Sequence, residues 1–332
     1  MQPSSKFLCL ATLLLVSIPA AAQKRIPVIL STDVGNEIDD QWAIVYLLVS
    51  PEFDVRGIAS AHAPSIAAPA GRVSYLILRD IVENRMNMLV HPPLLQGADV
   101  PLQDPSIPRE SEAVDFILEE SRKFSSENRL NVLTIGAFTD MASVILRDRS
   151  VINRVRVIDM GFRSWDQGAQ GEEYNIQNDP RAAQVVLNSG VPLVVGAGQV
   201  CRENLRLSLD KARVMMENRG PIGKWLWDEF AAWYYRFIKP LRKEDFTKPW
   251  IIWDTVVLAY LLGMTEEKTY PRPELQDNLT FRARDTKDTV IWITDVDEER
   301  MWSDFLKKLD HYQRTHHIGV SAPTGRLTSL LP

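Results

Sequence analysis

The sequence contains very little cysteine and histidine. Two cysteines and five histidines occur in 332 residues, and none of them forms a Cys-x-x-Cys pair or another spacing typical of a zinc site. Cys9 lies in the apolar stretch at the amino terminus, so a chain that has lost this stretch keeps only Cys201 and has no intramolecular disulfide. We interpret Cys201, beside the apolar run 194–199, as a small buried side chain and not as a nucleophile.

Several other signatures are missing as well. The chain has no glycine-rich phosphate loop with a lysine and no Gly-x-Ser-x-Gly elbow, which argues against a P-loop enzyme and an α/β-hydrolase. It also lacks an excess of positive charge: 38 Lys and Arg face 43 Asp and Glu, for a net charge of -5. A nucleic-acid partner is therefore not expected.

The amino terminus has the pattern of a signal peptide. Lys6 precedes an apolar core at 7–18, and three alanines end at Ala22, where we expect cleavage. The mature protein is then exported, periplasmic or extracellular, and without membrane contact. We predict one domain over residues 23–312 and a tail over 313–332, because no repeat or low-complexity linker divides the chain.

Strand and helix patterns alternate along the domain. Predicted strands are 28–30, 55–61, 130–135, 155–160, 191–196 and 289–294. Predicted helices are 39–48, 67–86, 110–124, 138–146, 180–187, 208–218, 222–237, 254–262 and 298–309, and 89–108 is a predicted loop. This alternation predicts an α/β fold with a mainly parallel, Rossmann-like sheet flanked by helices.

The most informative stretch follows the first strand. Asp33, Asp39 and Asp40 are placed at its carboxyl end, the edge where open α/β sheets bind ligands. Three carboxylates crowded there repel one another unless a cation or protons offset them. Their hard oxygens suit calcium or magnesium better than zinc. Turn and helix-capping roles are the simpler alternative; an aspartate nucleophile of a phosphotransferase is disfavoured because no phosphate loop accompanies it.

Polar residues also follow the later strands. Thr139 follows the strand at 130–135, the segment 167–179 follows the strand at 155–160, and Asp254 follows an apolar run at 250–253. Because parallel strands end at one edge of a sheet, we expect these residues to meet the first three aspartates. Gln167, at the start of its segment, is a candidate substrate contact.

Together these motifs resemble the inosine-uridine-preferring nucleoside hydrolase family, from Val28 to about Leu309. The matching motifs are Asp33-Val-Gly-Asn-Glu-Ile-Asp39-Asp40, Gly136-Ala-Phe-Thr139-Asp140, Glu173-Tyr-Asn175-Ile-Gln-Asn-Asp179-Pro180 and Trp253-Asp254. The resemblance implies the fold of that family and one Ca²⁺. The implied protein ligands of the ion are Asp33, Asp40, Asp254 and the carbonyl of Thr139. Implied contacts of the ribose hydroxyls are Asp39, Glu173 and Asn175, with Asp33 as the base that deprotonates water.

The sequence departs from the family pattern at three places. The opening turn is two residues longer than the short form, and the second strand runs into Ala61-His62-Ala63-Pro64 where Gly-Asn is usual, so that the Asn contact is missing or is replaced by His62. Trp253 occupies the position of a histidine that protonates the leaving base in some members. An indole can stack on a base but is no useful proton donor. His62 is therefore the candidate acid, with Tyr234 or Tyr235 as alternatives.

These observations predict an exported, Ca²⁺-dependent hydrolase that cleaves ribonucleosides to ribose and free base. One alternative is a related hydrolase of another ribosyl or glycosidic substrate. Another is a Ca²⁺-dependent sugar-binding protein that lacks turnover. The sequence leaves open the base preference and the oligomeric state, a homo-oligomer included.

Overall fold

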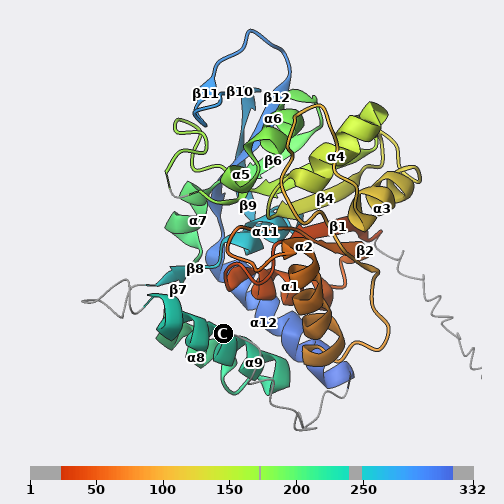
Figure 1. Cartoon of the computed structure of the whole chain (residues 1–332). Coiled ribbons are helices and arrows are strands. Elements are labelled where there is room, and N and C mark those ends of the chain that lie inside the picture. The colour runs from red at the N-terminus through yellow and green to blue at the C-terminus, as the bar shows by residue number, and fades with distance from the viewer. Residues whose placement is uncertain (1–23, 172, 239–248, 317–332) are drawn as a thin grey trace, which may run out of the picture.

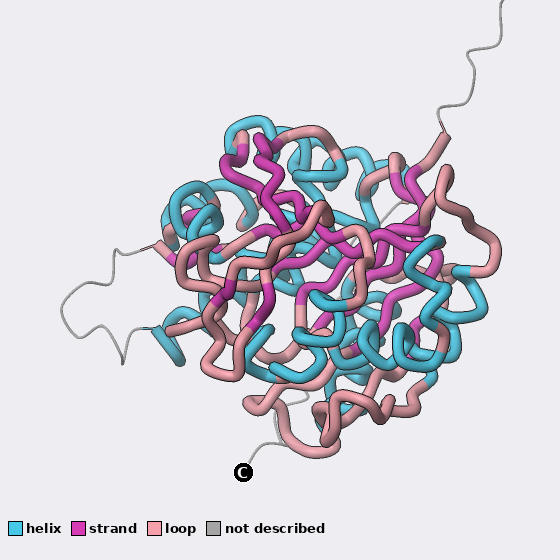
Figure 2. The backbone as a smooth tube through the Cα atoms, turned by 90° about the horizontal axis from the view of Figure 1, so that it is seen from above, coloured by secondary structure: helices cyan, strands magenta, loops and turns pink. Residues whose placement is uncertain are grey.

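The computed structural model describes residues 24–171, 173–238 and 249–316 (Figure 1). The expected signal peptide and most of the expected tail lie outside these residues. Within them, helices surround a central sheet, as the view from above shows (Figure 2). No helix of this described part has the length and apolar character needed to cross a bilayer.

The central sheet has eight strands in the order β3-β2-β1-β4-β5-β6-β12-β9. Their bounds are β1 Ile26–Thr32, β2 Phe53–Ser60, β3 Leu94–Leu95, β4 Leu130–Ile135, β5 Val155–Met160, β6 Leu193–Gly196, β9 Thr265–Pro271 and β12 Thr289–Val296. All pairs are parallel except β12 with β9. The predicted α/β class with a mainly parallel sheet is confirmed.

Helices cover both faces of this sheet because its strands are apolar on both sides. Leu30 and Leu133 belong to one hydrophobic cluster, whereas the adjacent Ile29 and Val132 belong to the other. The helices are α1 Asp39–Val49, α2 Ala70–Arg79, α3 Glu112–Ser121, α4 Thr139–Arg147, α5 Asn175–Asn178, α6 Pro180–Asn188, α7 Gly198–Asn204, α8 Leu209–Met216, α9 Gly220–Trp233, α11 Val256–Leu261 and α12 Glu298–Thr315. Residues from α1, α9 and α12 pack in the first cluster, and residues from α3, α4 and α6 pack in the second.

Several boundaries differ from the sequence prediction. Helix α2 begins at Ala70 and not at residue 67, because Pro69 disfavours helical backbone at the residue before it. It continues as the π-helical segment Asp80–Arg85. Helix α12 runs to Thr315, so the first residues of the expected tail are helical, and the buried Tyr312 anchors this end to the core.

The structure also contains strands that the sequence pattern did not indicate. β3 lies inside the predicted loop 89–108, and β9 has a mostly exposed, charged sequence, TEEKTYP. β9 is the sheet's edge strand, where charged side chains are normal. Two small pairs, β7 Arg206–Leu207 with β8 Trp250–Ile251 and β10 Glu274–Leu275 with β11 Phe281–Arg282, complete the described strands.

Candidate active site

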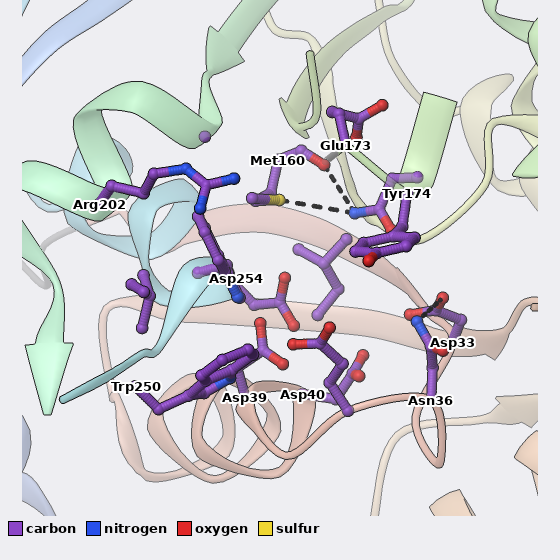
Figure 3. A pocket seen from close by; sticks show the side chains of 16 residues that line it. Asp33, Asn36, Asp39, Asp40, Met160, Glu173, Tyr174, Arg202, Trp250 and Asp254 are labelled. Atoms are coloured by element: carbon purple, nitrogen blue, oxygen red, sulfur yellow. Dashed lines mark hydrogen bonds between the residues drawn. The ribbon is translucent and has the colours of Figure 1, made fainter. Parts of the chain in front are cut away.

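Three aspartates meet at the carboxyl edge of the sheet. Asp39 and Asp40 begin α1, and Asp254 lies in the 3-10 turn Trp253–Thr255 that leads into α11. One carboxylate oxygen from each lies within 4.8 Å of the others, and all three side chains are buried. Asp33, just after β1, lines the same pocket (Figure 3). The strand-end rule therefore brings together residues from both ends of the chain.

A tight turn connects Asp33 to α1. Gly35 has a φ of 108°, a conformation that favours glycine, and a Cβ there would lie 2.6 Å from Cδ1 of Ile77. The backbone N–H of Asn36 donates to the carbonyl of Asp33 at 3.0 Å, and its side-chain amide donates to Oδ2 of Asp33 at 3.1 Å. The turn thus fixes the Asp33 carboxylate before the helix begins.

Gly136, after β4, lets a neighbouring backbone pass close to Asp33. A Cβ on Gly136 would lie 3.0 Å from both the Cβ and the amide nitrogen of Asp33. The preceding Ile135 lines the pocket. Strand β4 thus approaches the acidic cluster with its main chain.

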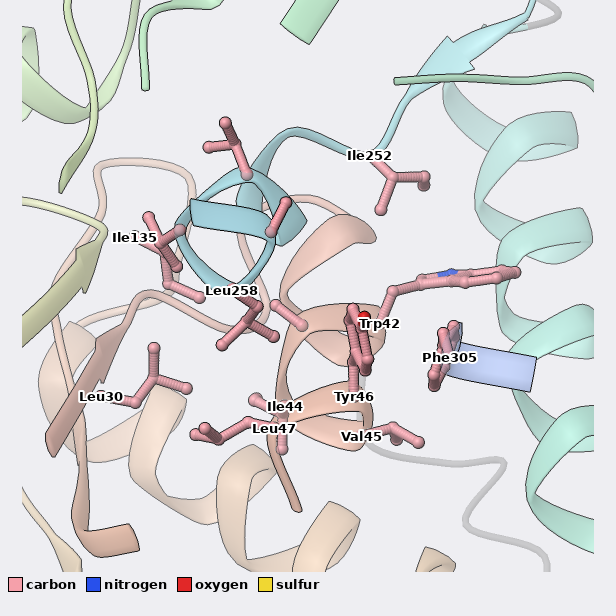
Figure 4. Close-up of a cluster of buried hydrophobic side chains, with 14 of the residues drawn as sticks. Leu30, Trp42, Ile44, Val45, Tyr46, Leu47, Ile135, Ile252, Leu258 and Phe305 are labelled. Carbon is pink, nitrogen blue, oxygen red and sulfur yellow. The ribbon is translucent and has the colours of Figure 1, made fainter. Parts of the chain in front are cut away.

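An aromatic core holds α1 in place beneath the carboxylates. Trp42 is fully buried and packs edge-on against Trp302 and Phe230, with ring centroids 5.7 Å and 6.0 Å away. Phe305 packs beside Trp42 and Tyr46 (Figure 4). Truncating a buried tryptophan costs about 3–5 kcal/mol, so this core can anchor a helix that carries like charges at its start. The acidic first turn is also favoured by the helix dipole.

The four clustered carboxyl groups have raised pKa values. For Asp33, Asp39, Asp40 and Asp254 the largest cause is burial, followed by repulsion from the neighbouring carboxylates. The hydroxyl of Thr32 donates to Asp40 and lowers its pKa only in part. A divalent cation among these oxygens would offset both effects, and the donor set, which is oxygen only, fits a hard ion. These residues can hold a metal.

A second wall of the pocket is formed by residues after β5. Glu173 accepts the backbone N–H of Ile176 at 3.1 Å, and its burial raises its pKa to about 8. Asn175 donates from its side-chain amide to the carbonyl of Met160 at 2.9 Å. This wall therefore presents a fixed carboxyl group and a fixed amide group to a ligand bound beside the aspartates.

A third wall combines two indoles with one cation. Trp250 and Trp253 line the pocket together with Glu37 and Arg202, and the guanidinium carbon of Arg202 lies 4.9 Å from the centre of the Trp253 ring. Burial raises the pKa of Glu37, while hydrogen bonds from both indoles and the charge of Arg202 lower it. Figure 3 shows Arg202 and Trp250 on one side of the aspartates and Glu173 and Tyr174 on the other. The cavity between the walls measures about 360 Å³.

The structure brings most of the predicted site residues into this pocket. Those that line it are Asp33, Asp39, Asp40, Glu173, Asn175, Trp253 and Asp254. Gln167 does not line it: the residue is exposed, in the loop after β5.

Thr139 and His62 lie outside the pocket lining too, in a buried polar chain of their own. Nε2 of His62 is 2.8 Å from Oγ1 of Thr139, and that hydroxyl donates to Asp179 at 2.6 Å. The carbonyl of Thr139 accepts the hydroxyl of Ser143, as expected in a helix. From this segment of the chain it is Ile135, and not Thr139, that lines the pocket.

Sequence reasoning missed several pocket residues. Arg202 and Met160 follow or end strands β6 and β5, so the strand-end rule that found the aspartates could have found them. Glu37 lies in the longer opening turn and could have been suspected from that insertion. Nothing in the sequence marked Trp250 and Tyr174 as pocket residues, because aromatic residues are more often part of the core.

The fold and the pocket together define a class of protein. It is an open α/β protein with a buried cluster of aspartates, able to hold a cation, at the carboxyl edge of its sheet. The family model described as inosine-uridine preferring nucleoside hydrolase matches residues 28–303. The chain belongs to this family, as the motifs in its sequence indicated.

Characterised relatives and solved structures agree with this assignment. The pyrimidine-specific ribonucleoside hydrolase RihA of Escherichia coli is 29% identical over 197 residues, 51% of this chain and 59% of that protein. Uridine nucleosidase 1 of Arabidopsis thaliana is 27% identical over 213 residues, 56% of this chain and 60% of that protein. The alignments thus span about three fifths of these relatives.

Two solved structures are similar over almost their whole length. The purine-preferring ribonucleoside hydrolase from Gardnerella vaginalis superposes with a TM-score of 0.70 at 18% identity, covering 87% of this chain and 99% of that one. A plant nucleoside hydrolase has a TM-score of 0.68 at 18% identity, with the same coverage. At this identity the likeness shows the fold.

Proposed function

We propose that the chain is a Ca²⁺-dependent hydrolase that cleaves the N-glycosidic bond of ribonucleosides to give ribose and a free base. The observation that carries the proposal is the convergence of Asp33, Asp39, Asp40 and Asp254 in one buried pocket. Its volume, about 360 Å³, is in the range of small-molecule sites. The names of the relatives support a ribonucleoside as the substrate.

Calcium is the ion that the donor set favours. The clustered groups Asp39, Asp40 and Asp254 offer carboxylate oxygens only, and Ca²⁺ accepts six to eight oxygen ligands in flexible geometry. Asp33 lines the same pocket and is proposed to add a further oxygen. When bound, the ion supplies charge that orients vicinal ribose hydroxyls and lowers the pKa of a water molecule.

Residues of the chain itself stabilise the developing charge, bind the ribose and accept the proton of the attacking water. The pocket's carboxylates stabilise the positive charge that develops on the ribose ring as the bond to the base breaks. Asp39 and Asn175 hold ribose hydroxyls, and Glu173 holds the 5′-hydroxyl end, since it lies on the wall that rises beside the aspartates. Asp33 takes the proton of the attacking water as the general base. The fixed turn around Asp33 keeps its carboxylate in position for that transfer.

Incubation of purified protein with inosine, uridine, adenosine and cytidine in the presence of Ca²⁺ tests the proposal. We expect release of free base and ribose from at least one of them, and loss of this activity in excess EDTA. Absence of release from all of them would count against it.

A binding protein without turnover is the second candidate. It is favoured by one observation: among the described residues that line the pocket there is no histidine to protonate a leaving base. Calorimetry that shows binding of ribose or a nucleoside, without hydrolysis, would support this candidate. A third, a hydrolase of other ribosides, would be identified by release of ribose from a glycoside panel.

We propose in addition that the protein is exported, since residues 1–22 have a signal-peptide pattern. Amino-terminal sequencing of protein recovered from a bacterial periplasm or medium should begin at Gln23. A mature amino terminus at residue 1 would refute export by this route.

A further inference from the structure

Cleavage of an N-glycosidic bond leaves both bonding electrons on the departing base, and this negative charge must be neutralised. A proton donor is one solution, and a fixed cation is another. Among the described residues that line the pocket, Arg202 is the one basic side chain. An arginine stays protonated in proteins, so it cannot act as the acid but can hold an anion by up to five N–H donors.

The geometry puts Arg202 on the wall that faces a base. In the binding mode proposed above, ribose hydroxyls lie at the aspartates and the Glu173 wall, and the substituent at C1′ extends toward the opposite side. Figure 3 shows the guanidinium of Arg202 above Asp254, on the side of the pocket away from Asp33. Its carbon lies 4.9 Å from the centre of the Trp253 ring, a cation–π distance, so a cation and a surface suited to stacking share this wall.

Two further features of this wall favour the assignment. Arg202 is half-buried on α7, which follows β6 and so begins at the same sheet edge as the aspartates. Glu37 lines the same wall, and the charge of Arg202 lowers the pKa of its carboxyl group.

We propose that Arg202 is a catalytic residue that stabilises the departing base as an anion, an inference that rests on the proposed hydrolysis of nucleosides. The C1′–N bond breaks, and its electron pair delocalises onto a ring carbonyl oxygen or nitrogen that accepts hydrogen bonds from the guanidinium. Water adds to C1′ and gives one proton to Asp33. The released base anion is then protonated from solvent, and Asp33 returns its proton to solvent, so that atoms and charge balance.

This role predicts a substrate class. Bases that carry a ring carbonyl, the 6-oxopurines and uracil, can place negative charge on an oxygen that Arg202 contacts. Adenine has an amino group at the corresponding position, which is a donor and is repelled by the donors of the guanidinium. This is the preference that the family's description, inosine-uridine preferring, already carries, so the new element is the residue that would produce it.

The test compares ribosides whose leaving groups differ in how much stabilisation their negative charge needs. Kinetics are measured for the wild-type protein, Arg202→Gln and Arg202→Lys, on inosine, uridine, adenosine and 4-nitrophenyl β-D-ribofuranoside. The nitrophenolate is a stable anion and leaves without help. Arg213→Gln, at an exposed arginine of α8 whose ion partner is 3.9 Å away, is the matched control.

We expect Arg202→Gln to lower kcat/KM for inosine and uridine by about 10²-fold or more, as removal of a charge-stabilising donor does in other enzymes. Its effect on the nitrophenyl riboside should be under about tenfold, and Arg202→Lys should recover part of the loss because it restores the charge. The control variant should match the wild-type protein on every substrate. Circular dichroism and thermal unfolding confirm that each variant is folded.

Three results would overturn the inference. One is an equal loss on the nucleosides and on the nitrophenyl riboside, which would make Arg202 a part of the pocket's structure. Another is an unchanged rate on nucleosides in both Arg202 variants. The third is a wild-type protein that cleaves the nitrophenyl riboside but no nucleoside, which would refute the proposed function itself and is recognised before any variant is made.

Discussion

One carboxylate oxygen of Asp39 lies within 4.8 Å of one of Asp254, although Asp39 begins the first helix and Asp254 follows the late strand β8. Burial and mutual repulsion raise the pKa of both carboxyl groups, so the protonated forms are favoured while no cation is present. Replacement of these protons by a divalent cation is the event on which the proposed chemistry depends.

Calcium should stabilise the protein against unfolding. A ligand that binds only the native state at about 100 times its Kd adds about 2.7 kcal/mol. We expect a higher Tm when CaCl₂ replaces EDTA, and a smaller rise with MgCl₂, whose ion demands stricter geometry. Differential scanning calorimetry measures both. Asp254→Asn should lose the response, and an identical Tm with and without calcium in the wild-type protein would exclude the metal site.

The metal-free protein should lose stability as the pH rises. Burial and mutual repulsion raise the pKa values of the clustered aspartates, and burial raises the pKa of Glu173 to about 8. A folded-state pKa above the unfolded value means that the native state binds more protons. The stabilisation from these groups is therefore fully present below about pH 4, near their unfolded pKa values, and is lost as the pH rises through about 8.

Urea unfolding in EDTA between about pH 5 and pH 8 tests this dependence. The free energy of unfolding should fall by more than about 1 kcal/mol over that range, since each unit of pKa shift corresponds to about 1.4 kcal/mol. Saturating calcium should remove the fall, because the ion replaces the protons. Stability that rises with pH in EDTA would contradict the assigned cause of the pKa shifts.

Asp33→Asn should abolish turnover and leave the fold intact. Removal of a general base typically lowers the rate by about 10²–10⁴-fold, and loss of one charge from a repelling cluster does not weaken the metal-free protein. Release of base is the readout, with Asp285→Asn at an exposed loop position as the matched control. Wild-type turnover in Asp33→Asn would remove Asp33 from the mechanism.

Gly136→Ala should impair the site through contact alone. The new Cβ would press on Asp33 from 3.0 Å, and overpacking of this kind costs about 1–3 kcal/mol. Gly263→Ala is a useful comparison, because that residue has a φ of 65° but no atom within 4 Å of a new Cβ. We expect the first variant to lose both activity and calcium affinity, and the second to lose only stability. Equal activity in the two would argue against a tight approach of β4 to Asp33.

His62→Asn should lower activity by less than about tenfold, below the range for loss of a general acid. Burial lowers the pKa of His62, so its ring is neutral at pH 7 and has no acidic proton to give. Its Nε2 lies 2.8 Å from Oγ1 of Thr139, and neither residue is among those that line the pocket. The pH profile of kcat/KM should keep its shape. If the variant loses a limb of this pH profile that the wild-type protein has, His62 is again the candidate for the leaving-group acid.

The sequence predicted the sheet and the aspartates well because both follow from strong local rules. Apolar strands buried on both faces read as short continuous runs, and polar residues at their ends must converge wherever parallel strands end together. The same rule brought the segment 167–179 to this edge, and the family resemblance singled out Glu173 and Asn175 within it. These features depend on the direction of the backbone, which the pattern of apolar residues along the sequence predicts.

What the sequence did not reveal depends on side-chain direction or on long-range pairing. The family resemblance implied the carbonyl of Thr139 as an ion ligand, whereas in the structure that carbonyl accepts the hydroxyl of Ser143 and Thr139 does not line the pocket. His62 was assigned to the site because it replaces a family motif, but its ring turns into a buried polar chain. β9 escaped notice because an edge strand with charges on both faces has no alternation to detect. Arg202 required the fold, since only the structure shows which wall it joins.

The two edges of the central sheet constrain how copies of this chain can associate. One edge, β3, pairs through two residues only, and the other, β9, exposes Glu266, Glu267 and Lys268. Extension of the sheet from one molecule to the next would need a longer partner strand at the first edge and would bring like charges together at the second. A homo-oligomer of this protein is therefore expected to be assembled through helices and loops, and such an interface can lie near the pocket mouth without altering the sheet that fixes the aspartates.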